Sequence, residues 1–213
     1  MKGARLTDVL PLPRVMGRTL PVEVAAENTD EQLMVRYGEG DFAAMEALVA
    51  RYHPRLHSFF VRTLAPPELI DDLVQDTFIR LMEQAVRYQP TGRFSTYLFT
   101  IASNLLKDER KRSRQRDLSL DDFPSDTYRF DRLSADAGEI GNAVEQTAGA
   151  RRVRFALSRL SHDLRVAVVL HHYHAFTYEE IAGVVGCPAG TAKSRVHHAV
   201  RQLRAMLGVD GDD

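Results

Sequence analysis

The sequence is poor in cysteine and contains no long apolar run. Cys187 is the single cysteine among 213 residues, which excludes an internal disulfide and fits a reducing compartment. No apolar stretch approaches the roughly 20 residues that a membrane-spanning helix needs. Asp8, Pro11 and Arg14 interrupt the N-terminal segment, which therefore does not resemble a secretory signal. These absences predict a soluble, cytoplasmic protein without membrane insertion.

Neither sign of charge dominates the chain, because 28 Lys and Arg residues face 29 Asp and Glu residues, for a net charge of −1. This balance excludes a uniformly basic coat for nucleic acid. The charges are nevertheless segregated. Residues 107–116 hold six basic and two acidic side chains, a net of +4, whereas residues 117–147 hold two basic and eight acidic ones, a net of −6. A basic stripe is thus followed by an acidic segment.

The patterns of the common catalytic sites are also missing. The sequence has no glycine-rich phosphate loop, no nucleophile elbow and no paired acid–base constellation. It therefore predicts no catalytic residues and no cofactor.

Helical periodicity dominates what is present. Apolar residues recur at steps of three and four from Asp30 onward, for example from Phe42 through the next 18 residues and from Leu69 to Met82. No segment alternates as a strand, so the fold class is all-α. We expect a mobile extension at 1–29, a helical domain at 30–112, a flexible acidic linker at 113–148 and a second helical domain at 149–208.

The most informative segment runs from Thr177 to Met206. Thr177 and Glu180 have the spacing of a capping box, and Gly186 with Pro188 breaks the helix that follows. A second helix from about Ala189 places basic and polar side chains opposite its apolar face, with no carboxylate among them. This arrangement predicts a helix-turn-helix whose second helix enters the major groove.

Two segments together resemble the extracytoplasmic-function (ECF) group of bacterial sigma-70 factors. Residues 73–112 (LVQDTFIRLMEQAVRYQPTGRFSTYLFTIASNLLKDERKR) resemble the second region of these proteins, and residues 177–199 (TYEEIAGVVGCPAGTAKSRVHHA) resemble the fourth. The resemblance implies an alternative sigma factor that binds core RNA polymerase and directs promoter recognition and transcription initiation. Family members are often inhibited by an anti-sigma factor, which makes one a candidate partner.

The resemblance also implies roles for individual residues. The helix at 69–86 would dock on core polymerase through Asp72, Leu73, Gln75, Asp76 and Arg80. Residues at 87–112 would open the −10 element and hold its unpaired strand, a task that suits polar pockets and cations. The candidates are Tyr88, Arg93, Ser95, Thr96, Asn104, Lys107, Arg110, Lys111 and Arg112. Phe94 and Tyr97 are equally compatible with the core and with base stacking.

The recognition helix would read the −35 element of promoter DNA. The residues with the required chemistry are Thr191, Lys193, Ser194, Arg195, His197, His198 and Arg201. The chain departs from the family at His198 and Val200, where arginine is common. Histidine cannot make the bidentate contact of arginine to guanine, so the −35 preference is left open.

Two alternatives follow from the same residues. A stand-alone helix-turn-helix regulator would bind duplex DNA without polymerase, although the basic, aromatic helix near residue 100 suits single-stranded DNA better than a ligand pocket. A metalloprotein would use His171, His172 and His174, which are close enough in sequence to share an ion. These histidines lack a neighbouring cysteine or carboxylate cluster, so no metal site is predicted.

Overall fold

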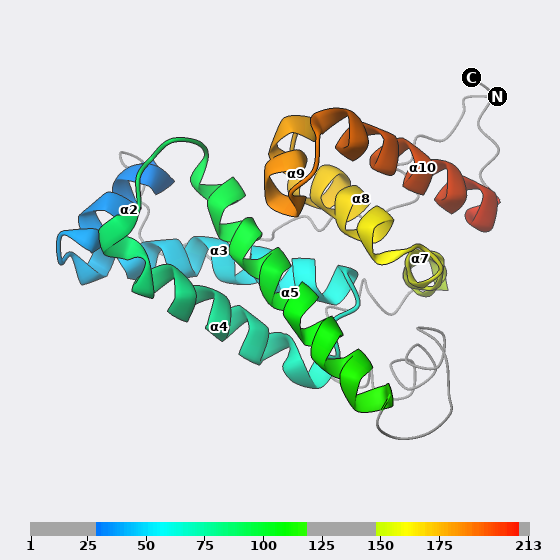
Figure 1. The fold of residues 1–213 in the computed structure, drawn as a ribbon, viewed down its shortest axis with the longest axis horizontal. Helices are drawn as coiled ribbons and strands as arrows, with labels where there is room; N and C mark the ends of the chain where they lie inside the picture. Colours follow the sequence, from blue (N-terminus) through cyan, green and yellow to red (C-terminus); the bar gives the residue numbers. More distant parts are fainter. Residues whose placement is uncertain (1–28, 119–147, 209–213) are drawn as a thin grey trace.

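The computed structural model describes residues 29–118 and 148–208, which contain helices and no strand (Figure 1). The α-helices and two 3-10 helices are α2 (Asp30–Gly38), α3 (Phe42–Arg62), η1 (Pro67–Leu69), α4 (Ile70–Glu83), η2 (Ala85–Arg87), α5 (Phe94–Leu118), α7 (Ala148–Ser158), α8 (His162–His174), α9 (Tyr178–Val185) and α10 (Ala189–Leu207). The all-α prediction is confirmed. None of the described helices has the length and apolar character that a membrane span requires.

The observed end of α5 differs from the expected start of the linker. Helix α5 continues to Leu118, so residues 113–118 extend a helix instead of beginning a linker. Arginine and glutamine are good helix formers, which allows this extension despite the lack of an apolar face. Residues 119–147 of the expected linker and residues 1–28 of the expected extension lie outside the described residues.

Helices α2–α5 form the N-terminal unit, in which α3 packs on α2 and α4, and α4 packs on α5 (Figure 1). Its core includes fully buried rings on α3 and α5, such as Phe59, Phe60 and Phe99. The backbone N–H of Phe94 donates to Glu31 Oε1 at 2.7 Å, so a carboxylate from α2 satisfies the first turn of α5. Burial would raise the pKa of Glu31, but the hydrogen bonds it accepts, chiefly from Phe94, lower that pKa overall.

Helices α7–α10 form the C-terminal unit, and α8 packs against both α9 and α10. Arg165 on α8 is 3% exposed and donates to the carbonyls of Leu157 and Leu160, each at 2.8 Å. Leu157 lies in the last turn of α7, and Arg165 also donates to the carbonyl of Ser158 at 3.2 Å, so the buried guanidinium caps that helix. Another nitrogen of the same guanidinium lies 3.4 Å from the carbonyl oxygen of Thr63, at the end of α3. Arg165 therefore also joins the two units.

An apolar seam, formed by Phe59, Phe99, His174 and Phe176, holds the two units together. The ring of His174 lies 4.9 Å from that of Phe99 and 6.0 Å from that of Phe59, measured between centroids. Phe176 contacts Phe99 from the turn after α8, with ring centroids 5.2 Å apart. All four side chains are buried, so the seam is continuous with the core of both units.

Some residues of the expected apolar faces are exposed. Phe42 is 74% exposed and Met82 is 37% exposed, although both fit the three–four spacing of their helices. Phe42 is the first residue of α3, and among the described aromatic rings its ring lies near that of Tyr37 on α2, with centroids 6.2 Å apart in a T-shaped arrangement. Periodicity therefore identifies the helix but does not fix how far the core extends along it.

His174 predicts a dependence of stability on pH. Burial, together with the nearby Arg55 and Arg62, lowers the pKa of His174 to about 3. An unfolded histidine has a pKa of about 6.5. Between pH 6.5 and the lower pKa of the folded state, this histidine is therefore protonated in the unfolded chain and neutral in the folded one, which destabilises the fold as the pH falls. We expect the melting temperature to fall as the pH is lowered from 7.5 to 5.

Replacing this ring separates its contribution from that of the other titrating groups. His174→Phe keeps a ring in the seam and should flatten the pH dependence of the melting temperature. His53→Gln, at an exposed position on α3 outside the seam, is the matched control for the loss of a histidine. Equal pH slopes for His174→Phe and the wild type would contradict the assignment.

Candidate nucleic-acid interface

The helix-turn-helix forms as its sequence predicts. The backbone N–H of Thr177 donates to Glu180 Oε2 at 2.8 Å, and that of Glu180 donates to Thr177 Oγ1 at 3.3 Å, which completes the capping box of α9. Gly186 ends α9 with φ of +72°, in the left-handed region that favours glycine. Helix α10 then begins at Ala189.

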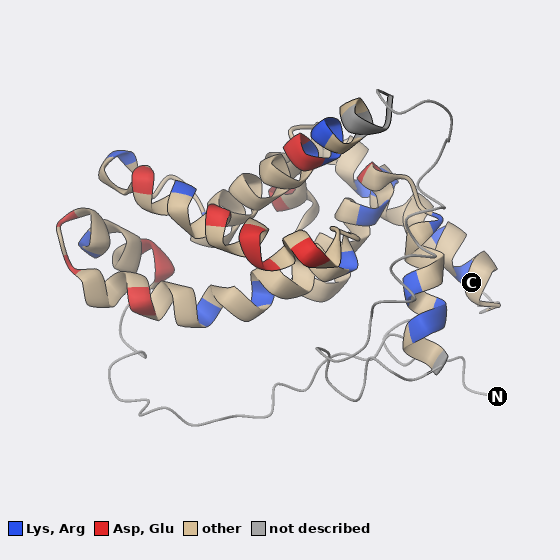
Figure 2. Ribbon diagram, turned by 90° about the horizontal axis from the view of Figure 1, so that it is seen from below, with Lys and Arg blue, Asp and Glu red and all other residues tan. Residues whose placement is uncertain are grey.

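Helix α10 presents a basic outer face. Val196, Ala199 and Leu203 are buried beneath it, whereas five of the candidate −35 residues are exposed: Lys193, Ser194, His197, His198 and Arg201. Thr191 and Arg195 are partly buried, and Arg195 donates to Asp163 on α8 at 2.7 Å. Helices α7 and α10 contain basic residues and no acidic ones (Figure 2). This face is therefore suited to a polyanion.

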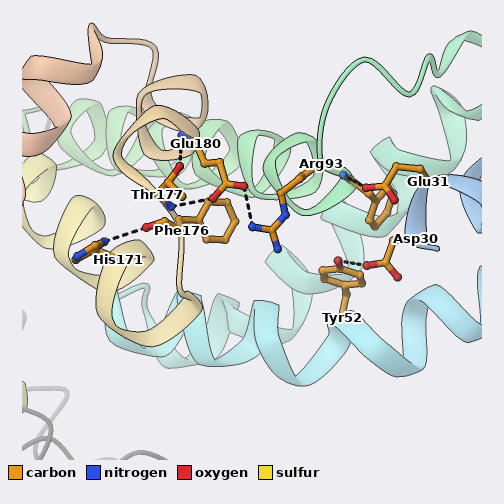
Figure 3. Close-up of polar contacts among 9 residues, drawn as sticks. Asp30, Glu31, Tyr52, Arg93, His171, Phe176, Thr177 and Glu180 are labelled. Carbon is orange, nitrogen blue, oxygen red and sulfur yellow. Dashed lines mark hydrogen bonds and ion pairs between the residues drawn. The ribbon is translucent and has the colours of Figure 1, made fainter. Parts of the chain in front are cut away.

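The candidate −10 residues divide into an exposed group and a covered group. Asn104, Lys107, Lys111 and Arg112 are exposed on α5, and Arg110 is partly buried. Arg93 precedes α5 and is exposed, and its guanidinium is directed towards α9 (Figure 3). Lys107, Lys111 and Arg112 are exposed cations on α5, of the type that binds phosphates, and the exposed Asp108 lies among them.

Three of the candidate −10 residues are less accessible than the sequence suggests. Ser95 is only 5% exposed, because the first turn of α5 is enclosed between α2 and the rest of the N-terminal unit. Tyr88 is half-buried, and burial and the nearby Glu31 raise the pKa of its hydroxyl to about 12. The hydroxyls of Tyr88 and Thr96 are buried without a hydrogen-bond partner among the described residues.

Phe94 and Tyr97, which suited both the core and base stacking, differ in burial. Phe94 is fully buried and contacts Tyr52 edge-on, with centroids 5.2 Å apart, so it belongs to the core. Tyr97 is partly buried, and its hydroxyl donates to Gln84 at 2.6 Å.

Helix α4 exposes an acidic row. Asp72, Gln75 and Asp76 are exposed, Arg80 is partly buried, and Leu73 is 6% exposed and lies in the core. The sequence reasoning missed two apolar members of the same surface, Ile79 and Met82, which are 39% and 37% exposed. Ile79 and Met82 follow Asp72 by seven and ten residues, a spacing that places them on the same face of the helix and could have identified them from the sequence. The surface thus combines carboxylates with exposed apolar side chains, as protein-binding faces do.

Of the clustered histidines, His171 joins helices of the C-terminal unit, and His174 lies in the seam between the two units. His171 stacks on Tyr178 at 4.9 Å between centroids, and its Nδ1 lies 2.9 Å from the carbonyl oxygen of Phe176. The hydroxyl of Tyr178 lies 3.3 Å from His197 Nε2 on α10. Within the described ranges, no group of three or more His, Cys, Asp and Glu residues could hold a metal ion.

Comparison with known proteins is consistent with this geometry. Residues 48–116 match Sigma-70 region 2, and residues 150–203 match Sigma-70, region 4. The RNA polymerase sigma factor CarQ of Myxococcus xanthus is 31% identical over 175 residues, covering 82% of this chain and 95% of that protein. The ECF RNA polymerase sigma factor EcfG of Rhodopseudomonas palustris is 32% identical over 158 residues, covering 74% of this chain and 82% of that protein.

Solved structures share the fold. The sigma factor RpoE of Bartonella quintana, in complex with the anti-sigma factor NepR, is 28% identical with a TM-score of 0.63, covering 78% of this chain and 98% of that one. CnrH, in complex with the cytosolic domain of CnrY, gives the same TM-score at 24% identity, covering 86% of this chain and all of the other.

The matched regions define a protein of the sigma-70 family. More narrowly, the chain belongs to the ECF sigma factors, which direct promoter recognition by RNA polymerase and are not enzymes.

The capping box of α9 can be tested against a matched cap. Thr177→Ala removes the side-chain acceptor for the N–H of Glu180 and should lower the free energy of unfolding by about 1 kcal/mol. Ser161 precedes α8 in the same position but makes no side-chain capping bond, so Ser161→Ala should cost less than about 0.5 kcal/mol. Denaturant titration compares the two variants, and equal losses would contradict the assigned cap.

Proposed function

We propose that this sigma factor divides promoter recognition between its two units. The N-terminal unit binds core polymerase through α4 and holds the −10 element along α5, and the C-terminal unit reads the −35 element with α10. The observation that supports this division most is the separation of chemistry. The exposed face of α4 is acidic and apolar, whereas the exposed faces of α5 and α10 carry cations.

The contacts assigned to α10 follow from its exposure. Lys193, Ser194, His197, His198 and Arg201 face outward from the recognition helix and supply the donors that base edges and phosphates accept. Thr191 precedes this set and Arg195 lies within it, and Arg195 would exchange Asp163 for DNA. On α5, Asn104, Lys107, Arg110, Lys111 and Arg112 follow the strand, with Arg93, Thr96 and Tyr88 at its start. Ser95 supports the loop from inside.

Two further properties complete the proposal. The protein acts in the cytoplasm, where core polymerase and promoter DNA are found, and its single cysteine suits that compartment. An anti-sigma factor is a candidate partner, because the related RpoE of Bartonella quintana was solved in complex with one.

Reversing charge on α4 tests polymerase docking. Asp72→Lys with Asp76→Lys replaces two exposed carboxylates and should weaken binding to core polymerase by about tenfold or more, with promoter-directed transcription falling in parallel. Glu39→Lys with Glu46→Lys makes the same change in net charge at exposed positions outside α4, at the end of α2 and on α3. That control should retain core binding. Equal affinities for the two double variants would show that α4 is not the docking surface.

The recognition helix is tested with a panel of promoter variants and reconstituted holoenzyme. Lys193→Ala should cost about 1–3 kcal/mol and relax the preference at one −35 position if Lys193 reads a base, as its place on the second turn of α10 suggests. Arg204→Ala removes an exposed cation from the last turn of the same helix and should change no base preference.

A uniform loss across the panel would instead make Lys193 a phosphate contact. Tight, sequence-specific duplex binding by the protein without polymerase would favour the stand-alone regulator.

A further inference from the structure

Helix α9 of the C-terminal unit contacts the very residues of the N-terminal unit that are assigned to the −10 element. Arg93 Nη1 donates to Glu180 Oε1 at 2.8 Å (Figure 3). Lys107 Nζ donates to the carbonyl oxygen of Val185 at 3.2 Å. A Cβ atom built on Gly183 would lie 3.5 Å from Thr96 Cγ2. All three contacts join α9 to α5 or to the residue before it, and the two helices pack side by side (Figure 1).

The contacts made by α9 are those that a phosphate backbone would make. Glu180 offers a carboxylate to Arg93, and the carbonyl of Val185 lies at the C-terminal end of α9, where the helix dipole is negative. Both cations are therefore partnered by acceptors of the same charge sign as a phosphate oxygen. A strand of nucleic acid would need the same two donors.

The packing also leaves polar groups buried on the covered face of α5. Ser103 is fully buried and follows Thr96 by seven residues, which puts both on the face that carries Lys107. The hydroxyls of Thr96 and Ser103 have no hydrogen-bond partner within the described residues. Buried, unpaired hydroxyls disfavour the contact, which indicates that this face is also suited to a state in which it is wet or bound.

We propose that α9 is an intramolecular competitor for the −10 face of α5, so that the free protein is closed and cannot hold the unpaired promoter strand. This inference rests on the −10 assignment made above. In the closed state the acidic face of α4 and the outer face of α10 stay exposed, so the protein can bind polymerase and duplex DNA before α9 leaves α5. Arg93, Thr96 and Lys107, which α9 contacts, become fully available to the strand only when α9 leaves α5.

The energetics favour a closed state that a partner can open. The Arg93–Glu180 pair is partly exposed, with 65% of the Arg93 side chain accessible, so breaking it alone shifts the equilibrium by at most about fivefold. The seam resists more strongly, because opening exposes Phe99 and Phe176 to water. Any ligand that needs the open state then binds with an affinity reduced by the open fraction.

Gly183 provides a matched pair of variants for the test. It is an exposed residue of α9, and Thr96 Cγ2 on α5 is the one described atom within 4 Å of a Cβ built there, so a side chain at this position lies on the α5 side of α9 and not in the core of the C-terminal unit. Gly183→Ala adds one methyl at ordinary contact distance and should preserve the closed state. Gly183→Leu overfills the contact with Thr96 and should raise the open fraction by about 5- to 150-fold.

The open fraction is measured in the full chain, in a Cys187→Ser background, by the alkylation rate of a thiol at Ser103→Cys. That thiol is buried on the face towards α9, and Gly183→Leu should accelerate its reaction about 5- to 150-fold over Gly183→Ala. A thiol at Ala102→Cys, buried on another side of α5, reports unfolding of the N-terminal unit and should not change. An unchanged rate at Ser103→Cys, or full reactivity already with Gly183, would overturn the closed state.

Glu180→Gln tests the ion pair without removing the cap, because the amide oxygen can still accept from Thr177. It should accelerate the thiol reaction at Ser103→Cys by no more than about fivefold, and Glu179→Gln, on the exposed side of the same turn, should not.

Transcription then separates this inference from the proposed function. At limiting protein, holoenzyme formed with Gly183→Leu should give more promoter-directed transcript than that formed with Gly183→Ala. Faster thiol reaction without more transcript would show that the contact is not inhibitory. If even the unaltered protein supports no transcription with core polymerase, the proposed function fails, and the thiol rates still report whether α9 covers α5.

Discussion

The burial of His174 and Phe176 against Phe59 and Phe99 determines how the rest of the molecule is arranged. This seam places the tip of α8 in the core of the N-terminal unit, and the turn that follows then brings α9 onto α5. A histidine is compatible with such a site only when it is neutral, and its pKa, lowered by burial and by Arg55 and Arg62, keeps it so at neutral pH. Arg165 adds a polar link between α8 and the end of α3.

Helix α5 links the packing of the two units to the proposed function, because it contacts other helices on several of its sides. One side packs on α4 and α3, its first turn is capped by Glu31 of α2, and another side meets α9. A helix that only supported a core would bury apolar side chains on all of these sides. Helix α5 instead buries Thr96 and Ser103 towards α9, where small polar residues are compatible with water or a nucleic-acid strand in a second state. This composition agrees with the proposed open state, in which α9 has left α5.

Local signals in the sequence were sufficient for the elements of the helix-turn-helix. Thr177, Glu180 and Gly186 act within a few residues of one another, so their cap and turn can be read without tertiary structure. The all-α class follows from periodicity in the same way. The family resemblance then supplied the candidate sites, because the residue types on α5 and α10 would also suit a solvated basic face.

Contacts between distant residues could not be read from the sequence. Glu31 and Phe94 are 63 positions apart, and nothing near either one indicates the hydrogen bond between them. The burial of Ser95 depends on α2 being there, and the exposure of Phe42 and Met82 depends on where neighbouring helices end. The seam escaped prediction for a related reason. A histidine at the end of an amphipathic helix has the same local pattern whether it faces solvent or another unit.

The arrangement gives the three candidate surfaces different availability. The acidic face of α4 and the basic face of α10 are exposed while α9 lies on α5, so the surfaces for polymerase and duplex DNA do not require a rearrangement. The part of the −10 surface at Arg93, Thr96 and Lys107 does, because α9 contacts these residues. Because α9 and α10 belong to one unit, a movement that seats α10 on DNA away from the N-terminal unit also withdraws α9 from α5. Under the proposed roles, such a movement would free Arg93 and Lys107 in a single rigid-body step, because α9 and α10 are packed together and joined by the short turn at Gly186.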